Sequence, residues 1–197
     1  MYNIVIMGDY FVGKTSIITR IIQDTFDLKT YSTIGTSYFS KDIKINGNNN
    51  IIKFSIWDTG GQERFRSFIT FYLKNAHIIF LCYDITNKQS FNNLHKWIKI
   101  IKENVKVNYI GVLIGTKLDL NNKRQVEKQY ANNYANSIDF FFYETSSKDN
   151  INIDTLFDFT INTFIKNNMN NIKKDLNTFK SKIVLEDNKN NNYFKYC

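Results

Sequence analysis

The sequence has no proline and only two cysteines, Cys82 and Cys197, among its 197 residues. Two cysteines are too few for a disulfide framework, which favours a reducing, intracellular compartment. No apolar run approaches the roughly 18 residues that a membrane-spanning helix needs. Residues 1–7 are apolar but lack a basic n-region and a small-residue cleavage site, so we interpret them as a buried strand rather than a secretory signal. No functional conclusion follows from the absence of proline.

The net charge of +8 is unevenly distributed along the chain. The last 32 residues, 166–197, hold seven lysines against three acidic residues and so carry half of the positive excess. This asymmetry predicts a basic tail rather than a basic face that binds nucleic acid. Two interpretations of the tail stay open, a solvated segment and a segment attracted to an anionic membrane.

Short apolar runs alternate with helical patterns along most of the chain. Apolar strands are predicted at 2–7, 77–83, 109–114 and 138–143, and helices at 14–22, 90–101, 126–136 and 153–165. Residues 37–45 and 51–57 alternate apolar with polar side chains around Asn46-Gly47, which favours a hairpin turn. We therefore predict an α/β fold with a six-stranded, mostly parallel sheet, one antiparallel edge strand and helices on both faces.

The periodic pattern ends near residue 166, where the chain becomes rich in Asn and Lys. We therefore predict one domain at 1–167 and a basic tail at 168–197. Ligands of parallel sheets bind beyond the carboxyl ends of the strands. The motifs described below all follow predicted strands, so we expect them to meet at one edge of the sheet.

The segment after the first strand reads Gly8-Asp9-Tyr10-Phe11-Val12-Gly13-Lys14-Thr15 and fits the phosphate-binding pattern G-x-x-x-x-G-K-[ST]. Its glycines let the backbone approach phosphates, and its N–H groups and the following helix N-terminus supply positive potential. Lys14 is expected to reach the β- and γ-phosphates, and the Thr15 hydroxyl is expected to ligate Mg²⁺.

A second motif, Trp57-Asp58-Thr59-Gly60-Gly61-Gln62-Glu63, follows an alternating strand. The Asp58 carboxylate suits a direct or indirect contact with Mg²⁺. Gly61 can offer an unhindered N–H to a γ-phosphate. Gln62 carries both a donor and an acceptor, so it can orient a water in line with the γ-phosphorus.

Two further motifs predict the base-binding side of the site. They are Gly115-Thr116-Lys117-Leu118-Asp119 and Glu144-Thr145-Ser146-Ser147-Lys148. One carboxylate, that of Asp119, can accept both N1–H and the N2 amino group of guanine, whereas adenine would leave it unpaired. The Lys117 stem can cover one face of the base, and Phe26 can stack on the other.

Together these motifs resemble the Ras superfamily of small GTPases, most closely its Rab branch, over about residues 1–167. The resemblance implies a phosphate-loop G domain that binds GTP or GDP with Mg²⁺, hydrolyses GTP slowly through Gln62, and holds the metal with Thr15, Thr33 and Asp58. The nucleotide-binding positions that it implies are Gly8, Asp9, Tyr10, Phe11, Val12, Gly13, Lys14, Thr15, Ser16, Phe26, Thr33, Gly61, Thr116, Lys117, Asp119, Ser146, Ser147 and Lys148.

The same resemblance implies a molecular switch in vesicle and membrane traffic, acting as a monomer. GTP would order the loops at 24–37 and 59–71 for effectors, exchange factors and GTPase-activating proteins. The implied effector surface consists of Ile34, Phe39, Trp57, Phe65 and Tyr72. The protein would be cytoplasmic and cycle onto the cytosolic face of an intracellular membrane.

Three positions depart from the family pattern and raise an alternative function. Tyr10 and Phe11 stand where the family has small residues, and Gly60 stands where most Ras and Rab proteins have Ala. The Tyr10 ring could crowd the space that Gln62 or an activator's arginine must enter, so the alternative is a GTP-bound interaction scaffold with very slow hydrolysis. An ATP-dependent kinase with a phosphate loop is disfavoured by Asp119.

The chain ends in a lone Cys197. Rab proteins usually end in paired cysteines, and other branches end in C-a-a-X. Either one geranylgeranyl group on Cys197 or an unmodified end is compatible with the sequence. A single lipid chain anchors only weakly, so the lysines of the tail would have to add the second membrane signal.

Overall fold

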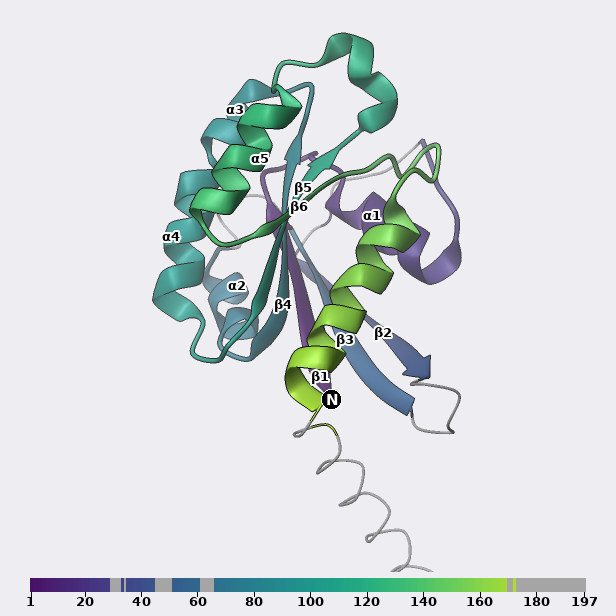
Figure 1. Ribbon diagram of the computed structural model, residues 1–197, viewed down its shortest axis with the longest axis vertical. Coiled ribbons are helices and arrows are strands. Elements are labelled where there is room, and N and C mark those ends of the chain that lie inside the picture. Colours follow the sequence, from purple (N-terminus) through teal and green to yellow (C-terminus); the bar gives the residue numbers. More distant parts are fainter. Residues whose placement is uncertain (29–32, 34, 45–50, 61–65, 170–171, 173–197) are drawn as a thin grey trace, which may run out of the picture. The chain divides into compact units, whose positions relative to one another are not determined.

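The computed structural model describes residues 1–28, 33, 35–44, 51–60, 66–169 and 172 (Figure 1). Its described strands form one six-stranded sheet in the order β2-β3-β1-β4-β5-β6. Only the β2–β3 pair of this sheet is antiparallel. The strands are β1 (Tyr2–Gly8), β2 (Thr36–Lys44), β3 (Ile51–Thr59), β4 (Ala76–Asp84), β5 (Ile110–Thr116) and β6 (Phe141–Glu144). The predicted fold class is thereby confirmed.

Helices cover both faces of the sheet (Figure 1). One face carries α2 (Arg66–Leu73), α3 (Lys88–Asn92), α4 (Leu94–Asn104) and α5 (Lys128–Ser137), and the other carries α1 (Lys14–Gln23) and the helical residues 153–160. A 3-10 helix, η2 (Leu118–Lys123), follows β5. In the described part of the chain no helix has the length and apolarity to cross a membrane.

The chain divides into two compact units, Met1–Thr160 and Ile161–Cys197. The described residues of the second unit, 161–169 and 172, are helical. The boundary between a domain at 1–167 and a tail at 168–197 stays a prediction, because most of the proposed tail lies outside the described residues.

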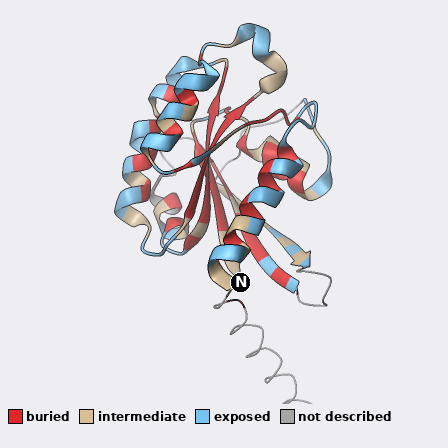
Figure 2. Ribbon diagram, in the orientation of Figure 1, coloured by how far each residue is buried: buried red, intermediate tan, exposed pale blue. Residues whose placement is uncertain are grey.

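The core lies on both sides of the central strands, which are almost entirely buried (Figure 2). On α4 the buried side chains Leu94, Trp97, Ile98 and Ile101 follow the i, i+3, i+4, i+7 spacing of one helix face. Each such side chain contributes about 1.5–3 kcal/mol relative to an exposed one.

The structure corrects three boundaries. The single helix predicted at 90–101 is divided at Asn93 into α3 and α4. Asn93 is held there because its amide donates to Asp9 and accepts from Gln89. The strand predicted at 138–143 begins only at Phe141, because the turn after α5 places Asp139 at φ 58°.

The third correction concerns the loop predicted at 59–71. Its last part belongs to α2, which buries Ile69 and Leu73 one turn apart. The hairpin turn predicted at Asn46-Gly47 lies outside the described residues. The strands that flank it pair from Thr36 opposite Thr59 to Lys44 opposite Ile51.

The carboxyl ends of the parallel strands lie at one edge of the sheet. The neighbouring pairs there include Gly8 with Cys82, Asp84 with Thr116, and Gly115 with Glu144. Every chemically informative motif of the sequence begins at this edge, which positions the site described below.

We predict that Gly111→Ala destabilises the fold. A Cβ atom at Gly111 in β5 would lie 2.4 Å from the buried ring of Phe140, and overpacking of this kind costs about 1–3 kcal/mol. Urea unfolding should show a lower midpoint for Gly111→Ala, and the double variant Gly111→Ala/Phe140→Leu should recover part of the loss. An unchanged midpoint for the single variant would contradict this packing.

Candidate functional site

The loop between β1 and α1 approaches the sheet closely at Gly8. Its φ is +141°, and a Cβ atom there would lie 2.2 Å from the Cys82 carbonyl oxygen, so only glycine fits. The loop ends at Gly13, which caps α1 at φ 90°. The loop N–H groups and the N-terminus of α1 therefore meet at the carboxyl edge of the sheet.

Lys14 is buried at the start of α1 and reaches back across this loop. Its Nζ donates to the carbonyl oxygens of Gly8 and Asp9, at 3.0 and 2.8 Å. Burial lowers the pKa of Lys14, an effect opposed by Cys82, Asp58 and Asp9. The arrangement places a cationic group inside the loop, where a phosphate could replace the carbonyl oxygens as its partner.

Three oxygen-bearing side chains from separate segments meet beside Lys14. The Thr15 hydroxyl donates to Asp58 Oδ2 at 2.6 Å and lies 2.7 Å from the Thr33 hydroxyl, which in turn lies 3.3 Å from Asp58 Oδ2. The three residues predicted to hold the metal are thus brought together.

The Asp58 carboxylate leaves one oxygen without a partner. It is fully buried, and within the described residues its Oδ1 accepts no hydrogen bond. Burial raises the pKa of Asp58, while hydrogen bonds from Thr15 and Thr33 and the charge of Lys14 lower it. An unpaired buried carboxylate oxygen beside two hydroxyls suits a hard cation that prefers oxygen ligands, and Mg²⁺ is such an ion.

The segments around Thr33 and Asp58 are also joined through the backbone. Gly60 N donates to Gly35 O at 2.8 Å, and the Thr59 hydroxyl donates to Ile6 O at 2.7 Å. The residues next to them, Ile34, Gly61, Gln62 and Phe65, lie outside the described residues, so their roles stay predictions.

The base-binding motifs meet the phosphate loop through Thr116. Its hydroxyl lies 2.6 Å from Val12 O and 3.0 Å from Tyr83 O. Farther along, Leu118 N donates to Thr145 O at 3.0 Å, and the Ser146 hydroxyl donates to Asp119 Oδ1 at 2.8 Å. Asp119 is therefore oriented by the second base-binding motif, as an acceptor of paired base donors would need to be.

These elements surround a cavity of about 380 Å³. Its two ends correspond to the predicted phosphate side and base side, with Lys14, Thr15 and Thr33 at the first and Phe26, Lys117 and Asp119 at the second. The lining residues are Tyr10, Phe11, Gly13, Lys14, Thr15, Ser16, Phe26, Leu28, Thr33, Thr59, Thr116, Lys117, Asp119, Leu120, Ser147 and Lys148.

The aromatic residues of the phosphate loop stand at the rim of this cavity. Tyr10 is 41% exposed and Phe11 58% exposed, and their ring centroids are 4.0 Å apart. Phe11 has a φ of 59°, a region that side-chain-bearing residues seldom adopt. The two rings therefore contact each other at the rim of the cavity.

Sequence reasoning missed two supports of the site. Arg20 on α1 donates to Ser147 O at 3.0 Å and to Lys148 O at 3.3 Å, fixing the last base-binding motif to the helix of the phosphate loop. The Asp9 carboxylate accepts from Trp97 Nε1 and Asn93 Nδ2 on the α4 side, at 2.7 and 2.6 Å. Both are long-range pairings that leave no local sequence signal.

An aromatic surface cluster lies beside the site. Tyr38 on β2 faces Trp57 in register, with ring centroids 4.9 Å apart, and Trp57 stacks on Tyr72 of α2 at 4.3 Å. Phe39, which the sequence analysis assigned to this surface, pairs instead with Ile56 and points to the opposite face of the sheet. The geometry therefore favours Tyr38 over Phe39 as the β2 member of this cluster.

Comparison with known proteins agrees with this geometry. The model of the Ras family matches residues 3–166. The chain is 38% identical to the Ras-related protein Rab-8A of Rattus norvegicus over 200 residues, which cover 99% of this chain and 95% of that protein. It is 40% identical to the Ras-related protein Rab-13 of Bos taurus over 157 residues, which cover 80% of this chain and 76% of that protein.

The phosphate loop, the oxygen cluster around Asp58 and the oriented Asp119 thus occur in a chain whose relatives are Rab proteins. The protein belongs to the Ras family, as a Rab-like small GTPase that binds guanine nucleotide and hydrolyses GTP.

Proposed function

We propose that this Rab-like GTPase is a two-state switch that regulates intracellular vesicle and membrane traffic from the cytosolic face of a membrane. The observation that carries the proposal is that Thr33, which precedes β2, and Asp58 of β3 both contact Thr15 of the phosphate-loop helix. A γ-phosphate bound at Lys14 would stabilise this arrangement, and its loss on hydrolysis would release it.

Mg²⁺ would be held by Thr15, Thr33 and Asp58. When bound, the ion would neutralise part of the negative charge on the β- and γ-phosphates. The chain itself supplies the hydroxyls and the carboxylate that hold the ion, and Lys14 supplies the second positive charge on the phosphates. Gln62 is proposed to orient the attacking water.

Guanine would occupy the end of the cavity that contains Asp119. Ser146 occupies only one acceptor position on Asp119 Oδ1, and an ionised carboxylate has about four. The remaining positions can accept N1–H and the N2 amino group together, while Phe26 and Lys117 line the cavity where the faces of the base would lie. Ser147 and Lys148 would close the same end.

We expect the purified protein to retain guanine nucleotide and to hydrolyse GTP in a single turnover. Extraction and chromatography should recover GDP or GTP rather than adenine nucleotides. Hydrolysis should require Mg²⁺, because Lys14 is the cation that acts on Asp58 within the described part of the chain, and so EDTA should abolish it. The Asp119→Ala variant is the matched control, since it should lose guanine nucleotide while keeping the metal ligands.

A protein that holds GTP but does not turn it over would instead support the scaffold alternative. The observation that favours this alternative is the position of Tyr10 and Phe11 at the rim of the cavity. Protein without bound nucleotide, and without affinity for GDP, would contradict both functions.

We predict that Tyr10→Gly hydrolyses GTP faster than the wild type. An arginine supplied by an activator raises the rate about 10³–10⁵-fold, and a ring beside the γ-phosphate would limit its access and that of Gln62. Single-turnover rates should be compared with and without an activating protein, and Phe11→Gly is the matched control for removing the neighbouring ring. Equal rates for Tyr10→Gly and wild type would show that Tyr10 turns outward.

The aromatic cluster of Tyr38, Trp57 and Tyr72 is the proposed effector surface, together with Ile34 and Phe65. Tyr38 is half exposed, and Trp57 and Tyr72 are partly buried. An exposed apolar cluster between two switch segments can bind a partner in only one nucleotide state. Exchange factors and GTPase-activating proteins would approach the same segments.

The basic tail at 168–197 is proposed to direct the otherwise monomeric protein to the membrane surface through Cys197. We predict one geranylgeranyl group on Cys197, detected by intact-protein mass and membrane fractionation from cells, and its loss in Cys197→Ser. Cys82 cannot substitute, because it is buried and burial raises its pKa to about 12. An unmodified mass in a protein that fractionates as soluble would contradict the prediction.

A further inference from the structure

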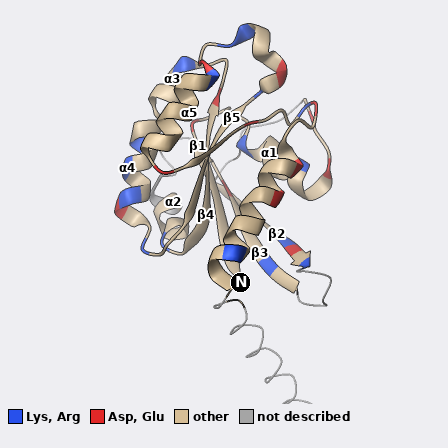
Figure 3. Ribbon diagram, in the orientation of Figure 1, with Lys and Arg blue, Asp and Glu red and all other residues tan. Residues whose placement is uncertain are grey.

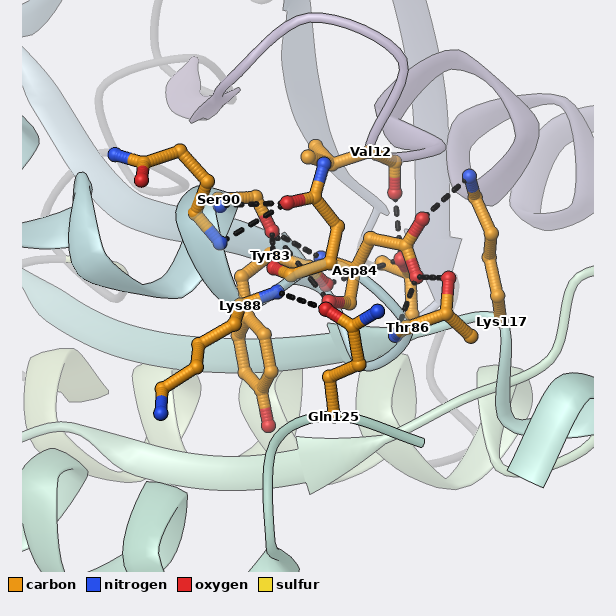
Figure 4. Close-up of polar contacts among 11 residues, drawn as sticks. Val12, Tyr83, Asp84, Thr86, Lys88, Ser90, Lys117 and Gln125 are labelled. Atoms are coloured by element: carbon orange, nitrogen blue, oxygen red, sulfur yellow. Dashed lines mark hydrogen bonds and ion pairs between the residues drawn. The ribbon is translucent and has the colours of Figure 1, made fainter. Parts of the chain in front are cut away.

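Asp84, the last residue of β4, carries a buried carboxylate whose two oxygens have different partners (Figure 4). Its Oδ2 lies 2.6 Å from the Lys117 ammonium. Its Oδ1 accepts from both the backbone N–H and the hydroxyl of Thr86, at 2.8 and 2.7 Å. The Thr86 bonds fix the carboxylate so that the other oxygen faces Lys117.

The backbone around Asp84 is fixed as well. Asp84 N donates to the Ser90 hydroxyl at 3.0 Å, and the next residue, Ile85, donates to Thr116 O and accepts from Gln125 N and Val126 N. Asp84 and Thr116 are direct neighbours in the β4–β5 register. Asp84 therefore stands on a rigid part of the molecule, next to the strand that leads into Lys117.

The two partners of this ion pair differ in exposure. The Asp84 side chain is 8% exposed and the Lys117 side chain 35%. A carboxylate buried this deeply is costly without a paired cation, so Asp84 favours the conformation of Lys117 that reaches it. Lys117 lines the nucleotide cavity, whereas Asp84 does not.

Lysine has a flexible four-carbon stem, and an unanchored lysine would sample several conformations at the base-binding end of the cavity. The Lys117 backbone is also unusual, at φ 61° and ψ 41°. With the backbone at one end and Asp84 at the other, both ends of the stem are fixed. The stem then lies as a preformed wall of the cavity before any base enters.

We propose that Asp84 is a positioning residue for guanine-nucleotide binding, which holds Lys117 ready to cover one face of the base. The inference rests on the guanine site described above and adds a residue that does not itself contact the nucleotide. It assigns a role to Asp84 at the end of β4 and to Thr86, which follows it.

The test is the dissociation rate of a fluorescent GDP analogue, measured by displacement with excess GDP at constant Mg²⁺. Asp84→Asn should keep the acceptor for Thr86 but lose the charge that holds Lys117, and the rate should rise about tenfold. Thr86→Val, which leaves Asp84 in place but removes one of its two anchors, should raise the rate by a smaller factor. Asp154→Asn, which removes an exposed carboxylate among the helical residues 153–160, is the charge-matched control and should not change the rate.

A double-variant cycle distinguishes positioning from simple support of the strand end. Lys117→Met keeps the stem but removes the ammonium, so in this background Asp84→Asn should cause no further acceleration. The proposal is overturned if Asp84→Asn speeds release by the same factor in both backgrounds, or if neither Asp84→Asn nor Thr86→Val changes the rate. If Asp84→Asn does not fold, Thr86→Val is tested instead, with Lys117 present and with Lys117→Met. It should speed release of the analogue only when Lys117 is present, and equal acceleration in both would overturn the proposal. Failure of guanine binding itself would appear as wild-type protein that does not bind the analogue.

Discussion

Buried charge at the carboxyl edge of the sheet is the constraint on which the rest of the site depends. Lys14, Asp58 and Asp84 are all buried, and such groups destabilise a fold unless they are paired or hydrogen-bonded. The protein satisfies Asp84 internally through Lys117 and Thr86. Among the described residues, however, the hydrogen-bond partners of Lys14 are carbonyl oxygens, and one oxygen of Asp58 has none. These unsatisfied groups are the ones that our proposal assigns to the phosphates and a divalent cation.

The same edge contains a hydrogen-bonded frame and the two segments that we propose as switches. Thr116 to Val12, Leu118 to Thr145 and Arg20 to Ser147 join the phosphate loop and both base-binding motifs into one unit. The segments at Thr33 and Gly60 contact this frame through hydroxyl and backbone bonds near Asp58. Lysines and arginines of the described chain are dispersed over several helices and strands rather than gathered at this edge (Figure 3), so the affinity for phosphate depends on the few groups placed there.

Much of this arrangement could be predicted because it is local. Strand periodicity and the position of each motif after a strand placed Lys14, Asp58 and Asp119 at one edge. In the structure Lys14 and Asp119 line one cavity, and Asp58 is hydrogen-bonded to Thr15, which also lines it. The hydrogen bonds from Arg20 to Ser147 and from Trp97 to Asp9 join segments that are distant in sequence. Hydrophobic periodicity carries no information about such contacts, so they could not be predicted. The assignment of Phe39 rather than Tyr38 to the aromatic cluster was wrong for a different reason. Both residues are aromatic and adjacent in sequence, and only the pairing register with β3 decides which of them meets Trp57.

The bond between Trp97 and Asp9 has a practical consequence. The chain contains two tryptophans. The indole N–H of Trp97 donates to Asp9 of the phosphate loop, whereas the Trp57 ring stacks on Tyr72 and contacts Tyr38 at a tilt. Indole emission depends on hydrogen bonding and on ring neighbours, so the unlabelled protein carries one intrinsic optical probe beside the phosphate loop and another on the proposed effector surface. Replacing either tryptophan by phenylalanine separates the two signals.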